Sequence, residues 1–436
     1  SIKKMMKKPK DLKPDTLSLH AGQRPDKEHG ARATPIYQTS SFVFKDSETA
    51  AGIFNAERTG HVYSRITNPT NAVLEERIAA LEGGVGAIAT ASGQAALNLA
   101  ILNIVDSGQH IVASNCLYGG SHNLLEYTLP RFGIKTTFVD FRDHSAVQKS
   151  FTEDTRLVFG ETLGNPGLNV MNIQEISEIA HQNGVPLLVD STFTTPHLIK
   201  PFEHGADLIF HSATKFLSGH GVVIGGLLVD SGSFEWDQNN KFPQLTEPYK
   251  GFHDMIFTEE FGPAAYINRA RKEGARDFGA CMSPHTAFLI LQGIETLGLR
   301  MDRHVQSTRE IVHYLNNHDA VISVCYPELD GHPDHFLAKE LFPKGCGAVF
   351  TFEIQGGREA GKVFIDNLNI FSHLANVGDS KSLVIHPAST THHRMNVDAL
   401  GEAGISEGTI RLSIGLEDVE DLKEDLSEAL RAASKL

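Results

Sequence analysis

Several features are scarce in this chain of 436 residues, and each scarcity narrows what the protein can be. Basic residues are outnumbered by acidic ones, 39 against 53, and the resulting net charge of −14 argues against nucleic-acid binding. No apolar stretch approaches the roughly 20 residues that a membrane span requires. The four cysteines include no Cys-x-x-Cys pair, so they offer neither a metal motif nor a disulfide framework, and they suit a reducing, cytoplasmic compartment.

Histidine, a common metal ligand, is abundant in the chain, with 22 residues. Two pairs, His332 with His335 and His392 with His393, could suggest a metal site. Neither pair lies in a clear helix with a third ligand at suitable spacing, so we expect no bound metal. The only basic cluster is formed by six lysines within the first 13 residues. No apolar segment follows it, so it does not resemble a secretory signal, and we expect a solvated tail there.

Between residues 70 and 230, short apolar runs alternate with helical patterns. The runs are continuously apolar, which is typical of parallel strands that helices bury on both faces. We therefore predict an α/β fold with a mostly parallel seven-stranded sheet and helices on both faces. The predicted strands are 85–89, 110–113, 136–139, 157–159, 186–189, 208–210 and 225–229, and the helices between them include 71–82, 94–104 and 172–182.

The remainder of the chain has a different pattern. Residues 231–262 show no steady periodicity, so we expect an extended loop. Helical patterns follow over 266–276 and 284–315, and a mixed strand and helix region continues to the C-terminus. Since the chain is too long for one ordinary core, we expect this last region to form a smaller α+β domain.

A lysine and an aspartate each follow a predicted strand. Asp190 ends one apolar run, and Lys215 stands five residues after Phe210, which ends another. Ligands bind at the carboxyl ends of parallel strands, where both residues would lie. Pyridoxal phosphate (PLP) needs both groups, because a lysine binds it as a Schiff base and a carboxylate keeps its ring nitrogen protonated, so that the ring accepts electrons. Taken alone, each residue is more often a solvated loop lysine or a turn-forming aspartate.

Other polar segments would suit the same cofactor. Ser92 is a natural N-cap, and the free N–H groups after it would form an anion site at a helix N-terminus. Ser212 and Thr214 could add hydroxyl groups beside Lys215. A routine capped helix and a simple Ser/Thr turn are the alternatives for these segments. Because neither a Walker motif nor a Rossmann glycine pattern is present, a nucleotide triphosphate or dinucleotide is disfavoured.

Three further residues have two interpretations each. Tyr118 precedes a Gly-Gly turn, where its ring could stack on a flat cofactor or merely cover the core. Asn165 lies in a turn by composition, and turns often present site residues. Arg411 alternates with apolar residues on a late predicted strand, so it is either an edge-strand charge or a bidentate clamp for a carboxylate.

In their order along the chain, six motifs resemble those of the PLP-dependent trans-sulfuration (Cys/Met metabolism) enzymes. The resemblance covers the chain from about Thr16 to the final helix. The motifs are Tyr63-Ser64-Arg65-Ile66-Thr67-Asn68-Pro69-Thr70, Ser92-Gly93-Gln94-Ala95-Ala96, Leu117-Tyr118-Gly119-Gly120, Val189-Asp190-Ser191-Thr192, Ser212-Ala213-Thr214-Lys215 and Arg411-Leu412-Ser413.

The resemblance implies the PLP fold type I. It implies an N-terminal arm over residues 1–65, a PLP-binding large domain over 66–265 and a C-terminal small domain over 266–436. Members of the family are usually homotetramers built from two tight dimers, in which the neighbouring subunit completes each active site. We therefore expect the arm to cross to a neighbour.

The same resemblance implies a role for each site residue. Lys215 is the Schiff-base lysine and the base that moves protons, and Asp190 pairs with the pyridinium nitrogen. Tyr118 stacks on the ring and could assist the leaving group. The cofactor phosphate is expected to contact Ser92, Gly93, Gln94, Ser212 and Thr214 of the same chain and Tyr63 and Arg65 of the adjacent subunit. The substrate site is expected to comprise Asn165, Asn376 and Arg411.

Within the family, the chain resembles the O-acetylhomoserine sulfhydrylases. The lyases and cystathionine γ-synthase commonly carry Ser-Leu-Gly where this chain has Asn376-Val377-Gly378, and methionine γ-lyases typically have a cysteine where Gly120 stands. The implied reaction is a γ-replacement in which sulfide or methanethiol displaces acetate from O-acetylhomoserine, giving homocysteine or methionine.

Several alternatives remain on the sequence alone. On the same fold they are cystathionine γ-synthase, an O-succinylhomoserine sulfhydrylase and methionine γ-lyase. From other classes they are a non-catalytic PLP-binding regulatory protein and an α/β nucleotide-binding module without PLP.

Overall fold

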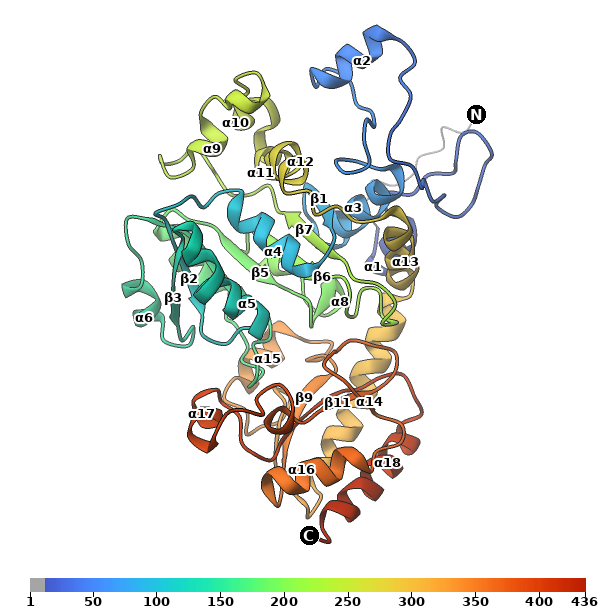
Figure 1. Cartoon of the computed structure of the whole chain (residues 1–436), viewed down its shortest axis with the longest axis vertical. Coiled ribbons are helices and arrows are strands. Elements are labelled where there is room, and N and C mark those ends of the chain that lie inside the picture. Colours follow the sequence, from blue (N-terminus) through green and yellow to red (C-terminus); the bar gives the residue numbers. More distant parts are fainter. Residues whose placement is uncertain (1–11) are drawn as a thin grey trace.

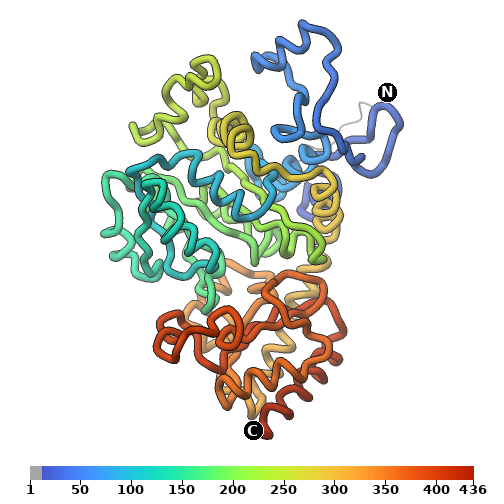
Figure 2. Tube along the Cα trace, in the orientation of Figure 1, coloured from blue at the N-terminus to red at the C-terminus, as the bar shows by residue number. Residues whose placement is uncertain are grey.

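A computed structural model describes residues 12–436 of the chain. The expected solvated tail lies almost entirely outside these residues. The chain forms an upper lobe, built on a sheet whose strands lie within residues 86–230, and a lower lobe, built on a sheet whose strands lie within residues 321–413. The colours along the chain separate the two lobes (Figures 1 and 2). No helix among the described residues is long and apolar enough to cross a membrane.

The upper sheet has seven strands in the order β1-β7-β6-β5-β4-β2-β3. Only β7 runs antiparallel to its neighbours, so the predicted mostly parallel sheet is confirmed. Each strand begins and ends within two residues of its predicted position. The strands are β1 Gly86–Thr90, β2 His110–Ser114, β3 Lys135–Val139, β4 Thr155–Glu161, β5 Leu187–Asp190, β6 Leu208–Ser212 and β7 Gly226–Asp230.

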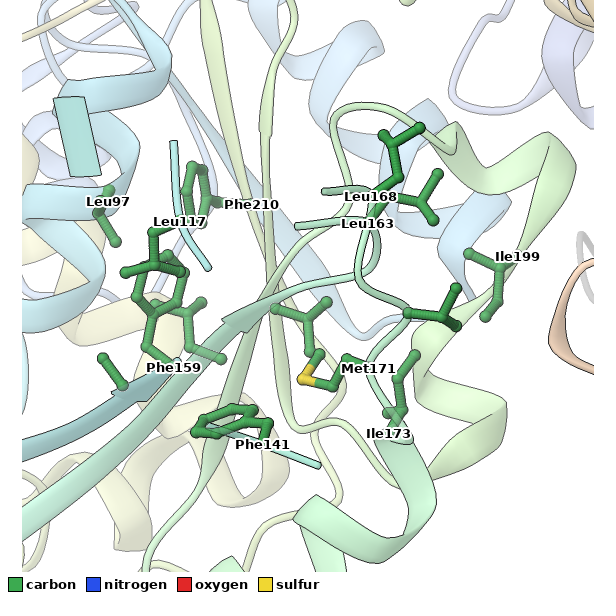
Figure 3. Packing of buried hydrophobic residues seen from close by; sticks show 14 of the residues in the cluster. Leu97, Leu117, Phe141, Phe159, Leu163, Leu168, Met171, Ile173, Ile199 and Phe210 are labelled. Carbon is green, nitrogen blue, oxygen red and sulfur yellow. The ribbon is translucent and has the colours of Figure 1, made fainter. Parts of the chain in front are cut away.

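Apolar side chains leave these strands on both faces. In β6, Leu208 and Phe210 join one buried cluster while Ile209 joins another, as the strand period of two residues requires. The first cluster includes Leu97, Phe159 and Phe210, which Figure 3 shows among the packed side chains. Because both faces of the sheet are buried, the sequences of its strands are continuously apolar.

Several helices of the upper lobe have N-cap residues whose side chains accept hydrogen bonds from the first turn. The capping residues Asn68, Ser92 and Asn172 accept hydrogen bonds from backbone N–H groups of the first turn. The helices of the N-terminal half are α1 Pro14–His20, α2 Ser47–Phe54, α3 Pro69–Glu82, α4 Gly93–Leu102, α5 Gly119–Asn123, α6 His144–Lys149, α7 Ile173–Gln182 and α8 Thr195–Leu198. The segment that carries α2 projects away from the body of the upper lobe (Figure 1).

The central segment contains shorter helices than its pattern predicts. The expected loop at 231–262 includes α9 Pro243–Thr246 and α10 Phe257–Phe261. The pattern over 266–276 becomes α11 Ala265–Arg269, a π-helical turn and α12 Arg276–Phe278. The pattern over 284–315 forms two helices, α13 Pro284–Glu295 and α14 Leu297–Asn316, because the backbone leaves the helical region at Thr296. The helical pattern predicted over 284–315 is confirmed, with one break at Thr296.

The lower lobe is the expected smaller α+β unit. Its five-stranded sheet has the order β10-β11-β12-β9-β8, with α16 and α18 packed against each other. Its strands are β8 Val321–Cys325, β9 Val349–Ile354, β10 Ser372–His373, β11 Leu383–Ile385 and β12 Thr409–Ser413, and its helices are α15 His335–Leu341, α16 Gly357–Asp366, α17 Val397–Glu402 and α18 Val419–Ala433.

The segment α11 to α13 lies with the upper lobe in Figure 1. The Tyr266 hydroxyl, for example, donates to the Ala100 carbonyl of α4 at 2.8 Å. The domain division into 1–65, 66–265 and 266–436 stays a prediction.

Candidate active site

A cavity of about 260 Å³ lies at the carboxyl ends of the parallel strands, where the upper lobe meets the lower one. Loops after β1, β2, β4, β5 and β6 line it from one side, and two segments of the lower lobe line it from the other. Eleven of the thirteen predicted site residues meet there. They are Ser92, Gly93, Gln94, Tyr118, Asn165, Asp190, Ser212, Thr214, Lys215, Asn376 and Arg411.

Tyr63 and Arg65 do not reach this cavity within the chain. Arg65 lines a separate pocket with Thr67 and Arg271, and the Arg65 guanidinium donates to the Arg276 carbonyl. Tyr63 is 42% exposed. Their expected contact with the phosphate of an adjacent subunit stays a prediction.

Asp190 ends β5 and lies half-buried at the floor of the cavity. Its Oδ1 accepts hydrogen bonds from the Thr192 backbone N–H at 3.0 Å and from the Thr192 hydroxyl at 2.5 Å. Burial raises the pKa of Asp190, while the bonds from Thr192 and the charge of Lys215 act in the opposite direction. A carboxylate held in this way can accept a further hydrogen bond from a cationic ring nitrogen, which it would stabilise.

Lys215 follows β6 and extends into the same cavity. Its Nζ donates to Oδ1 of Asn376, which comes from the lower lobe. Burial lowers the pKa of Lys215, and the nearby positive charge of Arg411 lowers it further. The close approach depends on Gly378, whose φ is +78° and whose added Cβ would stand 2.9 Å from the Lys215 carbonyl carbon. A lysine in these surroundings loses its proton more readily and can act as a base.

The N-terminus of α4 offers donors for an anion. Ser92 caps the helix through its hydroxyl, which accepts from the Ala95 N–H at 3.0 Å. The N–H groups of Gly93 and Gln94 lie in the first turn, where no intrahelical acceptor exists. Gly93 is required for the approach of α4 to β6, since an added Cβ would stand 2.8 Å from Ser212 Cβ. The side chains of Ser212 and Thr214 line the same region.

Tyr118 and Glu161 line the cavity from the upper lobe. The Tyr118 N–H donates to Glu161 Oε2 at 2.8 Å, and the Tyr118 side chain is 54% exposed. Burial and the charge of Asp190 raise the pKa of Glu161 well above its usual range. Sequence reasoning missed Glu161 and Thr192 as site residues. The signal available for Glu161 was its position at the end of β4, whose register places it beside Asp190.

Arg411 projects into the cavity from β12. This strand is paired on both sides, with β11 and β9, so the interpretation of Arg411 as an edge-strand charge is wrong. Among residues 12–436, no side chain or carbonyl accepts a hydrogen bond from its guanidinium, and burial lowers its pKa. A guanidinium held in a cavity without a protein partner is suited to bind a carboxylate supplied from outside.

Fold and site together define a class of protein. An amine, a buried carboxylate, a helix N-terminus and hydroxyl groups surround one cavity at the strand ends of an α/β sheet. This donor set matches the aldehyde, pyridinium and phosphate of PLP, so the residues present fit that cofactor. The class is that of PLP-dependent enzymes of fold type I.

Comparison with known proteins gives the family. Residues 15–431 match the family model described as Cys/Met metabolism PLP-dependent enzyme. The chain is 49% identical to an O-acetyl-L-homoserine sulfhydrylase of Leptospira meyeri, covering 97% of this chain and 98% of that protein. It is 46% identical to a homocysteine synthase of Schizosaccharomyces pombe, covering 96% and 98%. A solved structure from Campylobacter jejuni, which carries a pyridoxyl-lysine phosphate, has a TM-score of 0.93 and 37% identity and covers 96% of this chain and 100% of that one.

The chain belongs to the Cys/Met metabolism PLP-dependent enzymes. The predicted family, the fold type and the PLP cofactor are thereby confirmed. The roles of the individual site residues stay predictions.

Proposed function

We propose that this protein catalyses the reaction of O-acetylhomoserine with sulfide to give homocysteine and acetate, or with methanethiol to give methionine and acetate. The relatives from Leptospira meyeri and Thermus thermophilus are named O-acetyl-L-homoserine sulfhydrylases, at 49% and 46% identity over nearly the whole chain. The observation that carries the proposal is the placement of Arg411 and Lys215 in one cavity. An α-amino acid carries a carboxylate and an amine on one carbon, and this pair of residues offers a partner for each.

The cofactor is proposed to be held by the large-domain side of the cavity. The N–H groups of Gly93 and Gln94, with the hydroxyls of Ser212 and Thr214, donate to its phosphate. Asp190 accepts from the ring nitrogen, and Tyr118 covers the ring face. When bound in this site, PLP would supply a sink for the electrons released at the substrate carbon atoms.

The substrate is proposed to be oriented from the lower lobe. Arg411 binds its carboxylate through two parallel N–H donors, with Asn165 supplying a further donor. Lys215, as a free amine, removes the proton from Cα and carries protons between Cα, Cβ and the departing acetate. Asn376 accepts a hydrogen bond from Lys215 Nζ and so limits the directions in which the amine can reach. In the overall reaction, sulfide forms the new C–S bond at Cγ, and the Cγ–O bond to acetate breaks.

The position of Gly120 favours replacement over the lyase alternative. An added Cβ at Gly120 would stand 2.5 Å from Cε1 of Tyr118. A cysteine there, as the methionine γ-lyases typically have, would therefore require the Tyr118 ring to move. The ring that borders the proposed leaving-group position would then differ between the two kinds of enzyme.

The assembly is proposed to be a homotetramer in which Tyr63 and Arg65 reach the phosphate of an adjacent subunit. The exposure of Tyr63 and of apolar residues such as Val43 and Phe54 on the projecting segment supports this arrangement. A cytoplasmic location is proposed because all four cysteines are free, which suits a reducing compartment. With a net charge of −14, no nucleic-acid partner is proposed.

The test is an assay of the purified, PLP-loaded protein with O-acetylhomoserine and sulfide, scoring homocysteine and acetate in equal amounts. O-Succinylhomoserine with sulfide and O-acetylhomoserine with cysteine are run in parallel. Homocysteine formed preferentially from O-acetylhomoserine and sulfide is the expected result. Formation of cystathionine, or of 2-oxobutyrate and ammonia, as the main product would refute the proposed branch and leave the family assignment intact.

A further inference from the structure

The loop that carries Asn165 is a narrow hairpin between β4 and α7, here called the 163–170 hairpin. Leu163 and Val170 form an antiparallel bridge at its base, and the Gly164 N–H donates to the Asn169 carbonyl at 2.8 Å. Asn165 is on the side that faces the cavity. The position of the Asn165 side chain therefore depends on what holds this hairpin in place.

The tip of the hairpin is held by the lower lobe. The Gly167 carbonyl accepts from Nε2 of His332 at 3.1 Å and from the thiol of Cys325 at 3.1 Å. Nδ1 of His332 accepts from the Asp334 N–H at 3.0 Å, which fixes the ring proton on Nε2. Burial lowers the pKa of His332, in keeping with a neutral ring.

The base of the hairpin is held by Asp334. This residue stands at the N-cap of α15, yet its carboxylate caps no N–H of that helix. Instead, it accepts from Arg142 Nε at 3.0 Å, from Arg142 Nη2 at 2.6 Å and from the Val170 N–H at 2.9 Å. Arg142 also donates to the side-chain oxygen of Asn169, at 2.9 Å in the amide orientation that satisfies both groups. Burial opposes ionisation of Asp334, but these hydrogen bonds lower its pKa.

These contacts join two parts of the proposed substrate site. Arg411 belongs to the lower lobe, whereas Asn165 belongs to the upper one, and both are proposed to bind one carboxylate. The distance between them depends on how the lower lobe meets the 163–170 hairpin. His332 and Asp334 make that connection directly, and they lie on the same lobe as Arg411.

We propose that His332 and Asp334, with Arg142, are positioning residues that set Asn165 relative to Arg411 and thereby tune the site for the carboxylate of the amino-acid substrate. The proposal rests on the proposed function only in the carboxylate-binding roles given to Asn165 and Arg411. The three residues act through the hairpin and touch neither substrate nor cofactor.

The principal variant is Asp334→Asn, which keeps the shape of the side chain and removes its charge. Its matched control is Glu328→Gln, which breaks another multidentate ion pair of the lower lobe, that with Arg309, in which Arg309 Nε lies 2.9 Å from Glu328 Oε1. Arg142→Lys is the second variant, because lysine keeps the charge but loses the bidentate geometry. It keeps the test decisive if Asp334→Asn does not fold.

The measurement is a titration of the PLP-loaded enzyme with L-norvaline and with n-butylamine, followed by the change in cofactor absorbance. The two amines differ only in the carboxylate. We expect Asp334→Asn to weaken norvaline binding about tenfold, since small misplacements of a binding group are costly, and to leave butylamine binding unchanged. Glu328→Gln should change neither. Equal weakening of both amines, or equal effects of Asp334→Asn and Glu328→Gln, would overturn the proposal.

A double-mutant cycle adds a second criterion. If Asp334 acts through Asn165, Asp334→Asn should add little to the loss of norvaline affinity that Asn165→Ala already causes, whereas additive losses would exclude that route. These readouts do not involve sulfide or acetate. An enzyme that passes them and yet makes no homocysteine would refute the proposed sulfhydrylase reaction while supporting the positioning role.

Discussion

Carboxylic acids with little exposure lie at both ends of the strands in the seven-stranded sheet, but only one end carries the candidate site. The row of carboxyl ends of the parallel strands, which borders the candidate site, is here called the catalytic edge, and the row of ends on the other side is called the opposite edge. Asp190 and Glu161 lie at the carboxyl ends of β5 and β4, and Asp207 and Asp230 lie at the opposite edge, beside the start of β6 and at the end of the antiparallel β7. Burial raises the pKa of all four, that of Asp230 to about 7. A raised pKa therefore does not distinguish the two edges.

The surroundings of the acids do distinguish the two edges, although acids at both edges accept hydrogen bonds from protein donors. Asp230 accepts from the N–H groups of Gly232 at 2.9 Å and Ile267 at 3.3 Å. Asp207 accepts from the Leu187 N–H at 2.8 Å and from His181 at 2.7 Å. At this edge both oxygen atoms of Asp230, and the one hydrogen-bonded oxygen of Asp207, are directed at protein donors. These acids complete the hydrogen bonding of strand ends and turns.

At the other edge, cations face the acids across an open cavity. Lys215 and Arg411 both line it, and within residues 12–436 neither forms an ion pair. In this protein, a carboxylic acid with a raised pKa therefore marks the site only where unpaired groups of opposite charge and space for a ligand accompany it.

The largest effect is expected from Lys215→Ala, which removes the amine from the catalytic edge. Turnover of O-acetylhomoserine with sulfide should fall by more than about 10³-fold, since both cofactor attachment and proton transfer depend on this amine. The measurement is homocysteine formation, together with the visible absorbance of the protein. Lys241→Ala is the control, because burial also lowers the pKa of Lys241, which donates to the Asn183 carbonyl. Wild-type turnover in Lys215→Ala would contradict the assignment.

Arg411→Lys should have the next largest effect. Lysine keeps the charge but offers no bidentate fork, so kcat/KM for O-acetylhomoserine should fall by about 10- to 100-fold, while KM for sulfide changes little. Arg309→Lys, in the ion pair with Glu328, is the control. A variant that loses affinity for both substrates equally would indicate a general disturbance of the cavity rather than loss of a carboxylate partner.

Many residues of the catalytic edge could be predicted from the sequence because they lie at or just after the ends of strands. Asp190 ends an apolar run, Ser92 and Lys215 follow such runs within five residues, and strand polarity alone brings the ends of parallel strands together. The capping geometry of Ser92 follows from the same local pattern.

The parts that sequence reasoning missed depend on side-chain conformations or on contacts between distant segments. Thr192 supports Asp190 through a side-chain conformation that no pattern specifies, and Asp334 meets Arg142 across 192 positions of the chain. The helical pattern over 284–315 gave no position for the break at Thr296 between α13 and α14. Tyr63 and Arg65 lie away from the cavity of their own chain, so a single subunit does not test them.

Thr192→Val probes the support of Asp190 and should have a smaller effect. The hydrogen bonds from Thr192 lower the pKa of Asp190, so their partial loss should raise it. If activity needs the ionised carboxylate, the acid limb of the kcat/KM profile moves to higher pH, and activity at its plateau falls only about tenfold. Thr194→Val is the control, since the Thr194 hydroxyl bonds Thr162 and Ser191 and not Asp190. An acid limb that stays in place, or moves to lower pH, would exclude this role.

Asp230→Asn tests the opposite edge, where only stability should respond. The pKa of Asp230 is about 7 in the folded protein against 3.8 as its ordinary value, so the folded state binds this proton more tightly than the unfolded state does. The resulting stability is fully present below about pH 3.8 and is lost as the pH rises through about 7. Wild-type Tm should therefore fall between pH 5 and pH 8 by about 2–4 °C more than the Tm of Asp230→Asn, with turnover per folded enzyme unchanged. Identical pH slopes for the two proteins would show that Asp230 stays ionised, and a loss of turnover would show that the two edges are not independent.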